Sequence, residues 1–139
     1  MFEESISFNR TLGVVVLDCT PGATRLQIPM QPDFVGHYQY GRLHGGVISA
    51  TLDNAAALAL MSAIGEKFFD ESCEQVMARF SRMGTIDLRI DYLHPGLGDH
   101  FVASATVTRL GGRVGSTQMA LHNDTGLLIA TGAGAYVIS

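Results

Sequence analysis

Charged residues are scarce in this chain. They make up 16% of its 139 residues, whereas hydrophobic residues reach 47%. Roughly 25% charged residues is usual for a soluble domain. The nine Lys and Arg residues are dispersed and the net charge is −4, which argues against the basic face of a nucleic-acid-binding protein. Because a monomer of this size would struggle to bury so much apolar surface, we expect a homo-oligomer, a dimer at minimum and more specifically a tetramer.

The motifs of several enzyme classes are missing. The chain contains no G-x-S-x-G, which argues against an α/β-hydrolase, no P-loop, and no G-x-G-x-x-G after a strand. Gly132-Ala133-Gly134 falls within the predicted last strand and is interpreted as a packing feature. The five histidines lack metal-ligand spacing such as H-E-x-x-H, so we expect neither a metal nor a cofactor.

Cysteines are few, and no leader is recognisable. Cys19 and Cys73 form no C-x-x-C, which favours two free thiols in a reducing compartment. The first ten residues show no basic segment followed by an apolar run, so we expect no signal peptide and a cytoplasmic protein. Residues 47–65 approach the length of a membrane span, but Asp53 lies among small residues in the middle of the run. We therefore predict a buried central helix and no membrane span.

The most informative segment is residues 43–60, LHGGVISATLDNAAALAL. It begins a long apolar helix, expected from about Gly45 to Ile64 with Gly65 as its C-cap, and it places Asp53 eight positions inside. A buried, unpaired carboxylate is costly, so a carboxylate on such a helix needs a reason. The N–H groups and the dipole at the helix N-terminus favour negative charge. The segment therefore offers an oxyanion site and a base.

A second, shorter helix is predicted between Phe69 and Met83. Apolar residues there recur every three or four positions along one face, which is interpreted most simply as core. Ser72 and Gln75 have the spacing of a capping box, and Gly84 can end the helix.

The rest of the chain has the period of two that is typical of strands. Two strands are predicted before the long helix and four after the short one: 12–18, 24–30, 85–93, 101–107, 114–122 and 127–138. The hairpin-length links after Leu93 imply an antiparallel sheet, and its apolar face must be covered by the long helix. We expect an α+β fold in which an antiparallel sheet wraps around a long central helix, as a single domain over residues 1–139.

The chain resembles the hotdog-fold acyl-CoA thioesterases of the PaaI type, within the 4HBT-type superfamily. The resemblance rests on His44-Gly45-Gly46, on Asp53 nine residues after the histidine, and on GTIDLRIDYLHPG from Gly84 to Gly96. A closer resemblance is to the YigI-type bacterial medium- and long-chain acyl-CoA thioesterases. LHGGVIS, Leu52-Asp53 and the helical insert ending at Met83 carry it, together with the same strand.

Two positions depart from the pattern of these families. Tyr38 lies where some relatives carry an Asn near the thioester, and His94 lies where YigI-like chains tend to have Arg. We assign no role to Tyr38, and the charge contact made by that Arg is in doubt here.

The resemblance implies hydrolysis of acyl-CoA to a free fatty acid and coenzyme A. The Gly45 N–H would polarise the thioester carbonyl, with Gly46 beside it, and Asp53 would be the base or nucleophile. The alternatives are a packed turn for the glycines and an orienting role for Asp53. Thr85 matches a hydroxyl that holds the water or the carboxylate in some relatives, but it is equally an ordinary strand residue. His44 could hydrogen-bond the turn or the substrate carbonyl, and the alternative is a structural histidine that fixes the loop.

Contacts to the rest of the substrate are also expected. Arg82, Arg89 and Arg113 are candidates for the coenzyme A phosphates, although solvated surface charges are the commoner role. Phe80 and Met83, on the face of the short helix, could line the acyl chain instead of belonging to the core.

Helix geometry implies that the site needs two subunits. Eight helical residues span about 12 Å, so Asp53 cannot readily reach a carbonyl held by Gly45 of the same helix. We expect Asp53 from a second subunit, across an antiparallel two-fold dimer.

Two other functions have less support in the sequence. One is a hotdog dehydratase, whose D-x-N-P-x-H run is absent, and the other is a non-catalytic module that binds acyl-CoA or acyl carrier protein.

Overall fold

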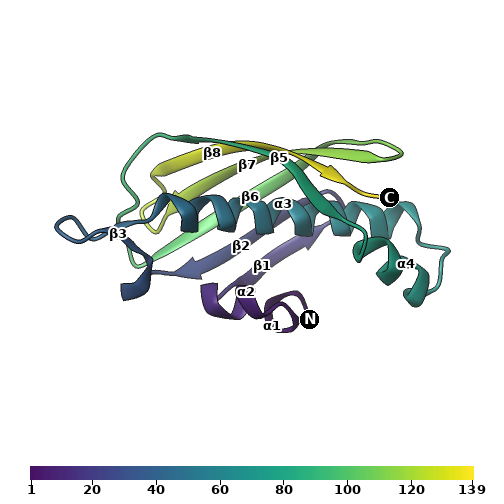
Figure 1. Cartoon of the computed structure of the whole chain (residues 1–139), viewed down its shortest axis with the longest axis horizontal. Coiled ribbons are helices and arrows are strands. Elements are labelled where there is room, and N and C mark those ends of the chain that lie inside the picture. Colours follow the sequence, from purple (N-terminus) through teal and green to yellow (C-terminus); the bar gives the residue numbers. More distant parts are fainter.

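One antiparallel sheet of six strands curves around one long helix in the computed structural model, which describes residues 1–139 (Figure 1). The helix, α3, spans Gly45–Lys67. The strands of the sheet are β1 (Val15–Thr20), β2 (Ala23–Pro29), β5 (Gly84–Tyr92), β6 (His100–Leu110), β7 (Val114–Asn123) and β8 (Leu128–Val137). The predicted α+β architecture is confirmed, and the bounds of the six predicted strands agree with these to within three residues.

The order of strands in the sheet is β1-β2-β6-β7-β8-β5, and every neighbouring pair is antiparallel. The chain leaves β5 at one edge and enters β6 in the middle, so β5 pairs with β8, the last strand. The other side of β5 has no partner strand in the chain. Its unpaired N–H and C=O groups are therefore available to a second copy.

One face of α3 is buried against the sheet. Its buried residues recur at helical spacing, and the alanines among them let the helix approach the strands closely: Ile48, Leu52, Ala55, Ala56, Ala59, Leu60 and Ile64. Thr24 on β2 donates a hydrogen bond to the Ala55 carbonyl at 2.9 Å. By length and composition α3 could cross a membrane. In this structure it is the core helix around which the sheet folds.

The end of α3 differs from the prediction. The helix continues through Gly65 to Lys67, and its C-cap is Phe68, whose N–H donates to the Ile64 carbonyl. Ile64 is 1% exposed, so its packing holds the last turn in place. The predicted C-cap at Gly65 is therefore wrong.

Two short helices precede the sheet, where a strand was predicted from Leu12. They are α1 (Phe2–Ser5) and α2 (Ser7–Leu12). Gly13 ends α2 in the left-handed conformation, with φ 69°, and turns the chain toward β1. Leu12 belongs to the core as a helical residue at 2% exposure.

The segment between β2 and α3, expected to be a loop, contains short regular elements. They are the 3-10 helix η1 (Pro32–Phe34) and the strands β3 (Val35–His37) and β4 (Arg42–Leu43), which pair with each other. The hairpin lies beyond the end of the sheet in Figure 1, and its Tyr38 is 87% exposed.

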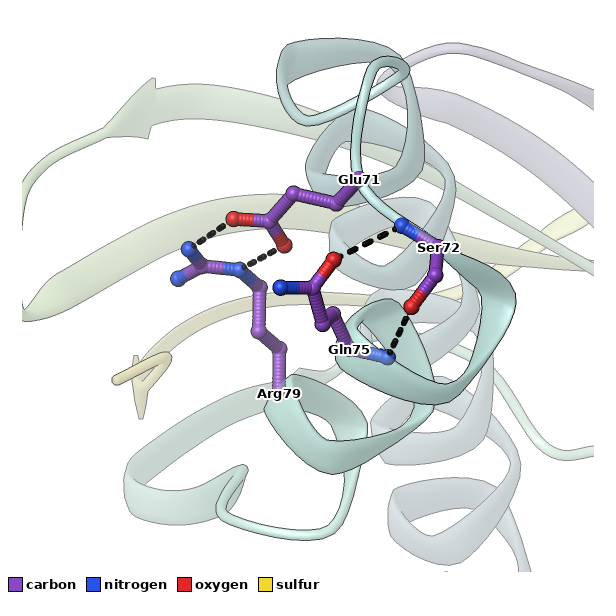
Figure 2. A network of polar contacts seen from close by, with 4 residues as sticks. All are labelled: Glu71, Ser72, Gln75 and Arg79. Carbon is purple, nitrogen blue, oxygen red and sulfur yellow. Dashed lines mark hydrogen bonds and ion pairs between the residues drawn. The ribbon is translucent and has the colours of Figure 1, made fainter.

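The inserted helix, α4, spans Cys73–Phe80 and lies at the C-terminal end of α3. The predicted capping box is confirmed: Ser72 and Gln75 exchange hydrogen bonds between side chain and backbone (Figure 2). Arg79 donates to Glu71 and lies over the Phe68 ring, and this hydrogen bond lowers the pKa of the Glu71 carboxyl.

The apolar face of the insert is not a core face in this chain. Phe69 lies before α4 and is 83% exposed, and no residue of α4 is fully buried. Phe80 and Met83 are half-buried and pack against the edge of the core. The prediction of a helix from Phe69 whose apolar face belongs to the core is therefore wrong.

Truncating Leu60 tests the packing of α3 against the sheet. Leu60 is fully buried, so Leu60→Ala should lower the free energy of unfolding by about 2–5 kcal/mol. Leu127→Ala, in a turn and 44% exposed, should change it by less than about 0.5 kcal/mol. Denaturant unfolding followed by circular dichroism, at one protein concentration, measures both. Equal losses would contradict this description of the core.

Candidate active site

His44 organises the N-terminus of α3. It is the N-cap residue, and its Nδ1 accepts a hydrogen bond from the Gly46 N–H at 2.8 Å. Its carbonyl accepts from the N–H groups of Val47 and Ile48. These bonds favour the loop-fixing role of His44. They engage the Gly46 N–H and leave the Gly45 N–H without a protein acceptor, at the positive end of the helix dipole.

Tyr92, the last residue of β5, packs on Gly45. Its hydroxyl donates to the Gly45 carbonyl at 3.1 Å, and a Cβ on Gly45 would lie 3.2 Å from the Tyr92 ring. The close approach of this ring is a physical reason for glycine at position 45. Tyr92 therefore ties the end of β5 to the N-terminus of the helix.

A pocket of about 300 Å³ adjoins Gly45. Its lining combines apolar and polar side chains and includes Arg42, Leu43, Ile48, Tyr92 and His94. The His94 Nδ1 lies 2.9 Å from the Leu128 carbonyl and must donate to it, because a carbonyl only accepts. The imidazole is thus held at the pocket, where the resemblance led to an expectation of Arg.

Asp53 is half-buried and has two partners in its own chain. Its Oδ1 accepts hydrogen bonds from the Thr85 hydroxyl at 3.0 Å and from the Tyr136 hydroxyl at 2.9 Å. The Asp53 carboxylate is therefore neither fully buried nor unpaired. Both donors converge on one oxygen, and Oδ2 has no protein donor. The hydroxyls hold the carboxylate while leaving one oxygen available for chemistry.

A β-bulge determines where Thr85 points. Strict alternation in β5 would place Thr85 on the same side as Asp87 and Arg89, opposite Leu88. The register shifts between Thr85 and Asp87, so Thr85 pairs with Tyr136 and Leu88 pairs with Gly134. Residues 134 and 136 lie on the same side of β8, so Thr85 shares the helix side of the sheet with Leu88. The bulge brings its hydroxyl to Asp53.

Tyr136 is the contact that the sequence analysis missed. It lies on β8, 83 residues from Asp53, and is 2% exposed. Burial, followed by the charge of Asp53 and the hydrogen bond to it, raises the pKa of the Tyr136 phenol. Only the pairing of β5 with β8 could have indicated this contact, because that pairing sets Tyr136 opposite Thr85.

The predicted substrate-binding residues lie outside this cluster. Arg89 is exposed and pairs with Asp91 at 3.0 Å, while Arg82 and Arg113 are exposed without an ion pair. Phe80 and Met83 lie just before β5, near the Thr85 end of the strand and away from the pocket at Gly45.

The two chemical groups are separated within one chain. Gly45 begins α3 and Asp53 is eight residues further along it, which corresponds to about 12 Å of helix rise. The free N–H lies beside the pocket, and Asp53 does not line that pocket. An N–H at a helix start can stabilise an oxyanion, and a carboxylate can act as a base or a nucleophile. One chain presents both groups but does not bring them together.

The model of the thioesterase superfamily matches residues 40–130 of this chain. The medium/long-chain acyl-CoA thioesterase YigI of Escherichia coli is 38% identical over 138 residues, which cover 99% of this chain and 89% of that protein.

Solved structures share the fold. A protein from Shewanella oneidensis related to the thioesterase superfamily superimposes with a TM-score of 0.93 at 33% identity, over 99% of this chain and 90% of that one. The E. coli PaaI protein from the phenylacetic acid degradation operon superimposes with a TM-score of 0.79 at 19% identity, over 99% of this chain and 87% of that one. This likeness concerns the fold alone. The hotdog architecture expected from the sequence is confirmed.

The raised pKa of Tyr136 can be tested by absorbance titration. The side chain of an ordinary tyrosine ionises at about pH 10, so Tyr136 should remain neutral at that pH while the protein is folded. Folded wild type and Tyr136→Phe should then gain the same phenolate absorbance between about pH 9 and pH 11. In denaturant, wild type should gain one phenolate more than the variant. An extra phenolate in the folded wild type would show that Tyr136 is not protected.

Proposed function

This chain belongs to the thioesterase superfamily, and we propose that it hydrolyses acyl-CoA thioesters to a free fatty acid and coenzyme A. The observation that carries the proposal is that the chain presents two reactive groups: a Gly45 N–H without a protein acceptor, beside a pocket, and an Asp53 carboxylate whose Oδ2 has no protein donor. Similarity to an acyl-CoA thioesterase along nearly the whole chain supports the substrate class.

In the proposed reaction, the thioester carbonyl accepts a hydrogen bond from the Gly45 N–H. Negative charge that develops on the carbonyl oxygen is stabilised by this donor and by the helix dipole. Asp53 acts through Oδ2 by one of two routes. As a base it takes a proton from water, which attacks the carbonyl carbon; the C–S bond then breaks, and the sulfur receives that proton and leaves as the thiol. As a nucleophile it forms an anhydride, releases the thiol, and water then cleaves the anhydride.

The proposed site is composite, with Gly45 from one subunit and Asp53 from its partner. The helix separation of about 12 Å argues against a site within one chain. The unpaired edge of β5 supports a two-fold partner, since two such edges can pair antiparallel. Exposed apolar residues at this edge, Ile86 at 55% and Leu93 at 48%, support burial by a second copy. Pairing of two dimers would give the proposed tetramer.

The acyl group is proposed to be medium or long. The relative named above acts on such chains, and the half-buried Phe80 and Met83 offer apolar surface near the start of β5. The exposed Arg82, Arg89 and Arg113 remain candidates for binding the coenzyme A phosphates.

The proposed location is the cytoplasm. Cys19 and Cys73 are both free and exposed, which supports a reducing compartment.

Two single variants test the chemical roles. Asp53→Asn should keep the fold and lose most turnover. Gly45→Pro removes the N–H at the first helical position, where proline is accommodated, and His44 already has the extended backbone (φ −62°, ψ 136°) that precedes proline. Loss of one oxyanion donor should lower kcat about 100- to 1000-fold. Gly45→Ala retains the N–H and controls for bulk beside Tyr92. Near-normal kcat/KM in Asp53→Asn would overturn its role.

Mixed dimers of the same variants test the composite site. A dimer of one Asp53→Asn chain and one Gly45→Pro chain contains one intact site if the two groups act across the interface, and none if they act within a chain. Differently tagged chains, co-expressed and purified through both tags, should recover the activity of one site. Mixed chains that remain dimeric but inactive would place the site within one chain.

A substrate screen tests the reaction and its acyl preference. Purified protein is assayed for thiol release from acetyl-, phenylacetyl-, hexanoyl-, lauroyl- and palmitoyl-CoA. We expect the highest kcat/KM among the longer chains. A preference for phenylacetyl-CoA would contradict the proposed chain length, and binding without thiol release would indicate a non-catalytic acyl-CoA module.

A further inference from the structure

We propose that Tyr136 is a positioning residue that fixes Asp53 so that Oδ2 is the reactive oxygen, and that Gly134 makes room for Tyr136 to do so. The proposal rests on the role of Asp53 in the proposed function. It extends the site to β8, the last strand of the chain, and to the Gly132-Ala133-Gly134 segment that the sequence analysis attributed to packing.

Two hydroxyls from neighbouring strands of the sheet donate hydrogen bonds to one carboxylate oxygen. Thr85 and Tyr136 are cross-strand partners in the β5–β8 ladder, and they donate to Asp53 Oδ1 at 3.0 and 2.9 Å. Two donors on the same oxygen restrict rotation of the carboxylate about its Cβ–Cγ bond. The side chain of Asp53 would otherwise turn freely enough to present either oxygen, so these bonds select Oδ2.

The surroundings of Tyr136 keep its hydroxyl as a hydrogen-bond donor to Asp53. Its side chain is almost completely buried, so the ring is held by packing and the hydroxyl has Asp53 as its partner. A phenol whose pKa is raised by burial above its ordinary value keeps its proton at neutral pH. Thr85, by contrast, is exposed and can exchange its partner for water.

Gly134 is the position that allows this placement. A Cβ there would lie 2.7 Å from Tyr136 Cε2 and 2.9 Å from its Oη, closer than real Cβ contacts. The ring is buried and cannot move aside freely, so any side chain at position 134 must displace the hydroxyl from Asp53. Gly132, two residues earlier, is crowded by other residues: a Cβ there would meet the side-chain ends of Ile90 and Met119 and would lie 3.2 Å from the Arg89 carbonyl oxygen, and it would not touch Tyr136.

The experiment compares Tyr136→Phe, Gly134→Ala and Gly132→Ala. Each folded variant is assayed for kcat and KM with the acyl-CoA that wild type hydrolyses fastest, and its unfolding midpoint is measured. Tyr136→Phe removes one hydrogen bond to a charged group, so kcat should fall about 10- to 100-fold with KM unchanged. Gly134→Ala should lower kcat in the same way. Gly132→Ala is the control for crowding in the same strand and should retain kcat within about twofold whatever its loss of stability.

The outcomes separate this proposal from the proposed function. If Asp53→Asn is inactive but Tyr136→Phe is folded and retains wild-type kcat, only the positioning role is overturned. Equal kcat losses in Gly134→Ala and Gly132→Ala would overturn the part played by Gly134. If Asp53→Asn retains wild-type kcat, the proposed function of Asp53 fails and the positioning role fails with it.

Discussion

The burial of one face of α3 by the sheet is the constraint on which the rest of the structure depends. The helix presents a continuous row of apolar residues, and the alanines in this row let the strands approach closely. Once the helix is held in this way, the strand β5 can contact it at two places: Tyr92 at the end of the strand bonds Gly45, and Thr85 near its start bonds Asp53. One packing interaction therefore positions both chemical groups.

The same packing explains why one chain holds two halves of a proposed site and not a whole one. A helix that is rigid over eight residues keeps the Gly45 N–H and the Asp53 carboxylate about 12 Å apart. The edge of the sheet formed by β5 is unpaired and carries exposed apolar side chains. In the proposed two-fold dimer the partner covers this edge, so the proposed oligomer and the proposed chemistry depend on the same edge of the sheet.

Much of the fold could be predicted from the sequence because its signals are local. The apolar spacing predicted α3 and the six strands of the sheet, and the spacing of Ser72 and Gln75 predicted the cap of α4. Predictions failed where distant packing decided the outcome. Gly65 remains helical because buried Ile64 holds the final turn, and Phe69 is exposed because α4 begins only at Cys73.

The sequence by itself determined the wrapped-helix architecture and named the chemical groups, since a His-Gly-Gly turn and a carboxylate on an apolar helix are visible in the order of residues. The tertiary structure decided how Asp53 is held. Thr85 reaches it because a bulge changes the phase of β5, and Tyr136 reaches it because β8 pairs with β5. Neither relation is local: a bulge depends on the register of a partner strand, and strand pairing depends on the closure of the whole sheet around the helix.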